Sequence, residues 1–210
     1  MDPTLQNLPN VWRAESLSAA PAHPIPSGHA QLDAALGGGW PSSALVELLT
    51  DQEGIGELQL LLPILRYFRD ERRTGLVLWL NPPYIPHALA LLQHGIDPAC
   101  HWVGTDLSPR DAGWAMELGL KSTACDAVIG WLPQVTPTGL RRIKLASASA
   151  QTFAVIFRPL AAARSPSPAT VRATLTAEAS RLRIDLLKVQ GRRQCTVTID
   201  VDTRIDAVLP

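Results

Sequence analysis

The segment Thr50–Glu57 is the part of the sequence whose residue types and spacing most resemble a ligand-binding loop. It is a glycine-bearing loop that follows an apolar run of strand length and precedes an amphipathic run. A loop in this place binds phosphate when it has the pattern Gly-x-x-x-x-Gly-Lys-Ser/Thr, because glycines expose backbone N–H groups, lysine neutralises charge and the hydroxyl holds Mg²⁺. Here the loop begins with Thr50, and Gly56 is followed by Glu57 and Leu58. The loop therefore has the place of a phosphate site without its chemistry.

The charges of the same loop act against a nucleotide. Besides its glycines, Gly54 and Gly56, it carries Asp51, Glu53 and Glu57 around the expected N-terminus of the next helix. Carboxylates there complement the helix dipole by themselves. Each would repel a triphosphate by about 4 kcal/mol at about 4 Å and an effective dielectric constant near 20. We predict a degenerate phosphate loop, no cofactor and no enzymatic activity.

Basic side chains in the second half of the chain are candidates for contact with DNA phosphates or with a partner protein. The range 158–193 has eight basic and two acidic residues, whereas the range 1–60 has one basic and seven acidic residues. This asymmetry suits a polyanion or head-to-tail contact between chains. The alternative is a solvated charged surface, and the loop 164–168 has no aromatic residue on which a base would stack. The candidates are Arg141, Arg142, Lys144, Arg164, Arg192 and Arg193.

Tryptophan is the most frequent aromatic residue, with six copies against two tyrosines and three phenylalanines. Exposed tryptophans commonly anchor interfaces. Trp12 and Trp40 are the candidate anchors, and for each the alternative is a place in the core or in a tail. These two residues therefore favour a protein partner or self-association.

Metal binding and membrane insertion find no support in the sequence. The five histidines show no ligand spacing, and Cys100, Cys125 and Cys195 are far apart and odd in number. We predict no metal site and reduced thiols, as in a cytoplasmic protein. No run of about 18 apolar residues could span a membrane. The expected location is the cytoplasm, with association with the nucleoid left open.

The segments that must position these residues alternate between apolar runs typical of strands and apolar residues at helical spacing. Continuous apolar runs of strand length fall at 44–49, 76–80, 126–132 and 152–157. Helical spacing falls at 57–73 (with Pro63 as a kink or first turn), 86–93, 112–121 and 138–150. This order predicts an α/β fold with a mainly parallel twisted sheet and helices on both faces.

The two ends of the chain differ from this pattern. Residues 181–186 and 195–201 alternate strictly around a turn at 190–193, which predicts a C-terminal antiparallel β-hairpin over about 181–202. Residues 1–27 hold five prolines and few periodic apolar positions. We therefore expect an extended arm over 1–27 and one core domain over 28–210.

The order of elements resembles the RecA-like recombinase core, and Gly28–Gly37 with Val46-Glu47-Leu48 resembles the approach to its phosphate loop. A closer resemblance is to the ImuA-type proteins, which are RecA-like accessories of bacterial mutagenic translesion synthesis, and it covers nearly the whole chain. The segments that carry it are Trp12-Arg13, Gly37-Gly-Gly-Trp-Pro41, Leu45–Leu49, Leu78-Trp-Leu-Asn-Pro-Pro83 and Gly95-Ile-Asp97.

The resemblance places the recombinase's catalytic positions on residues that cannot serve them. The invariant lysine falls at Gly56 or Glu57, and the glutamate that activates water falls at or near Pro83. The Mg²⁺-associated aspartate falls at Trp131, and the polar switch residue falls near Arg158. Because hydrolysis needs charge neutralisation, a positioned water and a metal, the resemblance implies a pseudo-ATPase.

The function that the resemblance implies is that of a non-catalytic adaptor. ImuA-type proteins act in SOS-induced mutagenesis with an inert Y-family polymerase homologue (ImuB) and an error-prone replicative-type DNA polymerase. RecA is an expected further partner, and the arm suggests self-association. One alternative is a SulA-like cell-division inhibitor that binds FtsZ, since SulA-type proteins share a stripped RecA-like fold. The other is an atypical DNA-stimulated ATPase.

Overall fold

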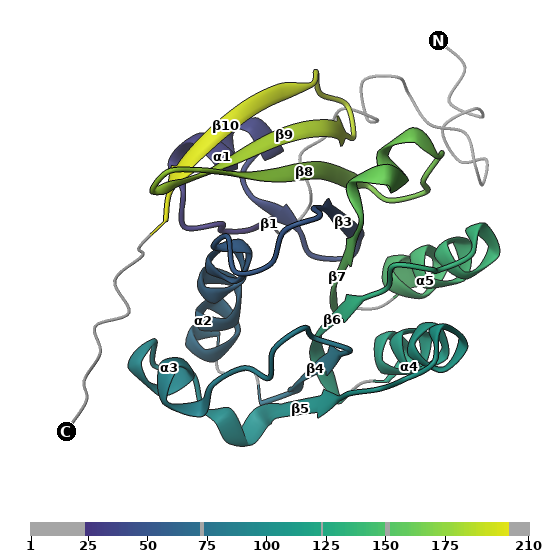
Figure 1. Ribbon diagram of the computed structural model, residues 1–210. Coiled ribbons are helices and arrows are strands. Elements are labelled where there is room, and N and C mark those ends of the chain that lie inside the picture. The colour runs from purple at the N-terminus through teal and green to yellow at the C-terminus, as the bar shows by residue number, and fades with distance from the viewer. Residues whose placement is uncertain (1–23, 72–73, 123, 150–151, 202–210) are drawn as a thin grey trace, which may run out of the picture.

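An eight-stranded mixed sheet runs through the protein, in the strand order β10-β9-β8-β3-β7-β6-β4-β5 (Figure 1). The computed structural model describes residues 24–71, 74–122, 124–149 and 152–201. The strands are β3 (Leu45–Leu49), β4 (Leu76–Leu80), β5 (His101–Gly104), β6 (Cys125–Trp131), β7 (Phe153–Arg158), β8 (Val171–Glu178), β9 (Arg181–Val189) and β10 (Cys195–Asp200). The run from β8 to β5 is parallel, whereas β9 and β10 are antiparallel additions at one edge.

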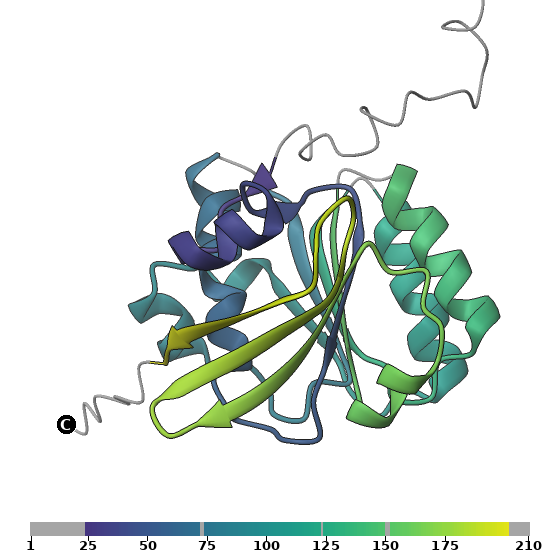
Figure 2. The same ribbon diagram turned by 90° about the horizontal axis from the view of Figure 1, so that it is seen from above.

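Helices cover both faces of this sheet, as Figure 2 shows from above. One face packs against α1 (Ala30–Leu36), α2 (Leu62–Asp70) and α3 (Ala88–Gln93). The other packs against α4 (Pro109–Lys121) and α5 (Pro137–Ser149). Strands buried on both sides are mainly apolar, and β3, with all five residues buried, is apolar except for Glu47. The predicted α/β class, the mainly parallel sheet and the C-terminal hairpin are confirmed.

The helix predicted over 57–73 differs in detail. The structure has a short 3₁₀ helix, η3 (Glu57–Leu60), followed by α2, which begins at Leu62. Pro63 lies in the first turn of α2, where its missing N–H is no loss. A proline is tolerated there but not in a helix interior. The single predicted helix is therefore replaced by η3 and α2, with Pro63 at the start of α2.

The strand β8 is absent from the sequence-based prediction. Its residues Val171, Ala173 and Leu175 are buried on one face, and the strand lies parallel to β3 and antiparallel to β9. β8 therefore makes β3 an interior strand, with β7 on its other side.

The glycine run before Trp40 serves a tight turn. Gly37, Gly38 and Gly39 all have positive φ, and a Cβ at Gly39 would lie 2.4 Å from the carbonyl oxygen of Ile25. Only glycine fits such a close approach of two backbones. The turn brings β2 (Trp40–Pro41) into antiparallel pairing with β1 (Pro24–Ile25) and buries Trp40, which is 1% exposed.

Candidate functional site

The loop between β3 and η3 binds a carboxylate of its own. The backbone N–H of Gly54 donates to Oε1 of Glu57 at 3.0 Å, and the N–H of Ile55 donates to Oε2 at 2.8 Å. The Glu57 side chain is held inside the loop, and the residue is only 5% exposed. Charge-assisted hydrogen bonds of this kind are what a phosphate would need from such a loop. Glu57 thus occupies the place of the anion.

The rest of the loop is held by contacts within itself and with neighbouring segments. The Thr50 hydroxyl accepts a hydrogen bond from the N–H of Gln52 at 3.0 Å, and Oδ1 of Asp51 accepts one from the N–H of Leu160 at 2.9 Å. Gly56 has a φ of 94°, and a Cβ there would lie 2.6 Å from Cγ1 of Val201. The predicted loop residues therefore do come together, and Thr50, Asp51 and Glu57 all accept hydrogen bonds from backbone N–H groups of the chain.

A cavity of about 450 Å³ opens beside this loop at the carboxyl ends of the strands, where α/β proteins bind ligands. Pro83 and Trp131, at or near which the resemblance predicts the recombinase's acidic positions, both line this cavity. The Trp131 ring stacks on Phe157 with centroids 4.6 Å apart. The Asn81 amide is engaged with the backbone of Leu107 at 2.8 and 2.9 Å. The cavity wall opposite the loop thus combines the aromatic pair Trp131 and Phe157 with prolines, Asn81 and Arg158.

Sequence analysis did not single out the strongest electrostatic feature, a buried ion cluster under the loop. Glu47 on β3 is 0% exposed, and its carboxylate lies 2.7 Å from Nη1 of Arg158 and 2.7 Å from Nε of Arg172. Three adjacent strands, β7, β3 and β8, supply the cluster. A glutamate within an apolar strand signals a buried cation partner. Finding Arg172 as that partner required the strand β8.

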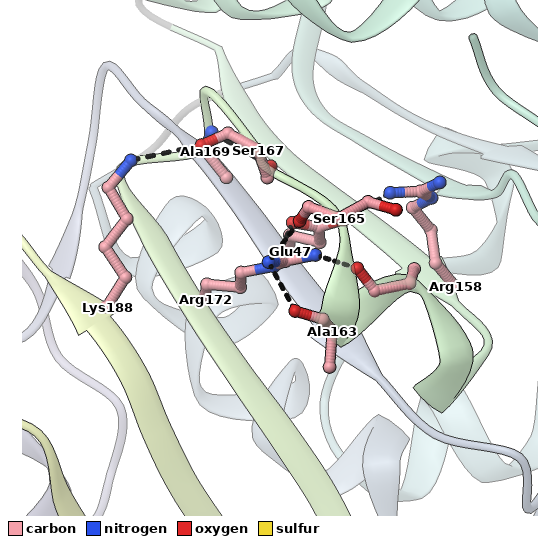
Figure 3. Close-up of polar contacts among 9 residues, drawn as sticks. Glu47, Arg158, Ala163, Ser165, Ser167, Ala169, Arg172 and Lys188 are labelled. Carbon is pink, nitrogen blue, oxygen red and sulfur yellow. Dashed lines mark hydrogen bonds and ion pairs between the residues drawn. The ribbon is translucent and has the colours of Figure 1, made fainter. Parts of the chain in front are cut away.

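Arg172 extends this cluster to the segment that follows β7. Its guanidinium donates to the carbonyl oxygens of Ala162, of Ala163 at 3.3 Å and of Ser165 at 2.8 Å (Figure 3). These carbonyls belong to or follow η5 (Leu160–Arg164). The ion cluster therefore fixes η5 and Ser165, and Asp51 binds the same segment at the N–H of Leu160.

The predicted basic residues do not form one patch. Arg142 bridges α5 to Glu117 on α4 at 2.6 Å, and Arg192 donates to the carbonyl of Ala34 at 3.0 Å, beside α1. These helices cover opposite faces of the sheet. Exposed positions are left at Arg141, Arg164 and Arg193.

Lys144 has a partner that the sequence did not predict. Its Nζ lies 2.5 Å from Oγ1 of Thr170, and burial, with Lys188 nearby, lowers the pKa of its ammonium group. Lys188 donates to the carbonyl of Ser167 at 3.2 Å. The two lysines thus hold the loop before β8, and Figure 3 shows the contact of Lys188.

The two candidate tryptophan anchors have different outcomes. Trp12 lies outside the described residues. Trp40 is part of the core, which favours the core alternative for this residue. Among the described residues, no group of three or more His, Cys, Asp or Glu could hold a metal ion. Every helix in the described ranges is too short or too polar to cross a bilayer.

The fold and site together define an α/β protein whose phosphate-loop position is filled by its own glutamate. No family model matches the chain. It is distantly similar to cell division inhibitors named SulA. The one from Yersinia enterocolitica is 28% identical over 119 residues, which are 57% of this chain and 70% of that protein. Those from Yersinia pestis and Yersinia pseudotuberculosis are 30% identical over 102 residues, 49% of this chain and 60% of each.

Proposed function

We propose that the chain is a non-catalytic adaptor of RecA-like fold that acts in SOS-induced mutagenic translesion synthesis. It contacts an inert Y-family polymerase homologue, with an error-prone replicative-type polymerase and RecA as further partners. The observation that carries the non-catalytic part is the bidentate binding of Glu57 to Gly54 and Ile55. A protein whose phosphate loop is closed acts by contact.

The energetics of the loop support this reading. A phosphate in the loop would displace Glu57 from two N–H donors and leave its buried carboxylate without them. A buried polar group left without its partner costs about 1–3 kcal/mol, and more when it is charged. No lysine of the loop offsets that cost, since Glu57 and Leu58 follow Gly56.

The translesion role is supported by the segments that resemble ImuA-type proteins, because these segments have specific structural duties. The run Gly37–Gly39 makes the turn that buries Trp40. At the end of β4, Asn81 has a φ of 49° and binds the backbone of Leu107. Both segments are therefore demanding local structures, unlike a chance match of apolar residues.

The test is affinity capture of the tagged full chain from bacteria treated with a DNA-damaging agent. We expect the inert Y-family polymerase homologue among the captured proteins, with enrichment over untreated cells. Purified chain and purified homologue should also bind each other directly in calorimetry. Absence of direct binding between the two purified proteins would refute this role.

A second function is favoured by the similarity to SulA proteins: inhibition of cell division by binding FtsZ. The same captured material distinguishes the two, because FtsZ would replace the polymerase homologue. In sedimentation assays, purified chain would reduce the polymerised fraction of FtsZ if this second function holds. Unchanged FtsZ polymerisation at equimolar chain would exclude it.

A further inference from the structure

Two largely buried arginines share a single carboxylate beneath the loop after β3. Among the described residues, Glu47 is the one acidic side chain that forms an ion pair with Arg158 or Arg172. Arg172 also donates to three backbone carbonyls, whereas the side chain of Arg158 has its hydrogen bond to Glu47 and no other in the described part of the chain. The surplus positive charge of the cluster therefore lies at Arg158.

The guanidinium of Arg158 has one edge without an acceptor. Its hydrogen bond to Oε1 of Glu47, at 2.7 Å, uses Nη1, and its Nε has no hydrogen-bond partner within the described ranges. The side chain is only 10% exposed, and a buried donor without an acceptor is costly in free energy. The fork formed by Nε and Nη2 is the arrangement that binds a carboxylate through two parallel hydrogen bonds. This edge therefore fits a carboxylate supplied by a ligand.

Arg158 lines the cavity of about 450 Å³ at the carboxyl ends of the strands. Beside it the rings of Trp131 and Phe157 stack with an interplanar angle of 14°, and Trp131 also stacks on Trp79. Stacked rings and prolines have little freedom to rearrange, so the cavity is preformed. An apolar cavity with one placed charge is typical of a ligand site. The prolines that line it are Pro83, Pro133 and Pro159.

We propose that this cavity binds a carboxylate that is attached to a flat apolar group. The carboxylate pairs with the Nε–Nη2 edge of Arg158, and the apolar group lies against Trp131. Free aromatic acids have this chemistry, and so does the end of a polypeptide whose last residue is aromatic. The proposal concerns the cavity and is independent of the proposed function.

The charges on the loop side of the cavity select against phosphate. Asp51 and Glu53 line the same cavity, but both are exposed, so water screens them. Arg158 is shielded from water and acts more strongly on a bound anion. A phosphate ester carries about 1.5–2 negative charges at pH 7 and is repelled more by the two carboxylates than a singly charged carboxylate is. One guanidinium is therefore matched by one carboxylate.

The test is calorimetric titration of the full chain with phenylacetate and with the peptide acetyl-Gly-Gly-Phe. Phenylacetamide and the C-terminally amidated peptide are the matched neutral probes. We expect saturable binding of at least one acid and binding of its amide that is weaker by about tenfold or more. Tighter binding of the peptide assigns the site to a polypeptide end, and tighter binding of phenylacetate assigns it to a small molecule.

Variants connect the binding to the cavity. Arg158→Lys keeps a positive charge beside Glu47 but lacks the fork, so it should weaken binding of the acid by about tenfold. Glu53→Gln removes an exposed negative charge from the cavity and should strengthen binding by about twofold to fivefold. Arg141→Lys, at an exposed position on α5 outside the cavity lining, should bind as the wild type does. Far-UV circular dichroism verifies that each variant is folded.

Several outcomes overturn the proposal. They are the absence of saturable binding by both acids, amides that bind as tightly as the acids, and phenyl phosphate that binds more tightly than phenylacetate. An unchanged affinity in folded Arg158→Lys also overturns it. If Arg158→Lys unfolds, Glu53→Gln decides, because an unchanged affinity in that variant would place the acid outside this cavity.

Discussion

The loop after β3 and the edge at β5 differ in how their interacting groups are used. In the loop, the N–H groups of Gly54 and Ile55 already bind Glu57. At the edge, Trp102 and its apolar neighbours are exposed. The phosphate-loop position is therefore filled by the chain's own glutamate, whereas the outer strand β5 leaves its apolar side chains exposed. The two regions thus differ in whether their interacting groups already have partners within the chain.

The largest expected effect comes from breaking the ion cluster under the closed loop. Glu47→Gln would leave Arg158 and Arg172 buried without their carboxylate, which is expected to cost about 3–5 kcal/mol of unfolding free energy. Urea denaturation followed by circular dichroism measures this. The control is Arg183→Ala, since Arg183 makes solvent-accessible pairs with Glu178 and Asp185 and its loss should change stability by no more than about 1 kcal/mol. Equal effects of the two substitutions would contradict the role of the cluster.

A smaller loss of stability is expected when the Glu57 carboxylate is removed from the loop. Glu57→Ala leaves the N–H groups of Gly54 and Ile55 without acceptors and should cost about 1–3 kcal/mol. Glu53→Ala changes an exposed carboxylate of the same loop and should be nearly neutral. Thermal denaturation compares the two variants with the wild type.

Nucleotide binding by the wild-type chain tests the closed loop directly. Wild-type chain should show no rise in melting temperature with Mg²⁺ and ATP, and no phosphate release with or without DNA. Saturable ATP binding by the wild-type chain would contradict the closed loop, and phosphate release above the blank would favour the atypical ATPase.

The smallest expected effect is the pH dependence of stability that comes from His101 on the edge strand β5. Burial lowers the pKa of His101 below its value of 6.5 in the unfolded chain. Between these two values the unfolded chain binds a proton that the folded chain does not, so stability should fall as the pH drops below about 6.5. The melting temperature from pH 7.5 to pH 5 measures this. His101→Gln should flatten the dependence but not abolish it, because burial also lowers the pKa of His29. An unchanged slope in His101→Gln would contradict the assignment.

The fold was predictable where one local signal dominates. Continuous apolar runs gave the parallel strands, and strict alternation gave the hairpin of β9 and β10. The strand β8 was missed although its apolar residues Val171, Ala173 and Leu175 alternate with Arg172 and threonines, the kind of pattern that predicted the hairpin. The arginine is buried against Glu47, a contact between residues distant in sequence that periodicity does not reveal.

The candidate site was predictable in its residues but not in its geometry. The three acidic residues of the loop predicted that it repels phosphate. Only the structure shows that the Glu57 carboxylate binds the N–H groups of Gly54 and Ile55. For the basic residues, charge alone did not predict where in the fold they lie. Arg142 and Arg192 make contacts on opposite faces of the sheet.

The unequal burial of the tryptophans gives the molecule a built-in optical reporter. Trp40 and Trp79 are shielded from solvent, whereas the indoles of Trp102 and Trp114 are mostly open to water. A polar quencher such as iodide should therefore extinguish emission from the latter pair first. Any event that covers the β5 edge would register as lost quenching, without a label and without altering the chain.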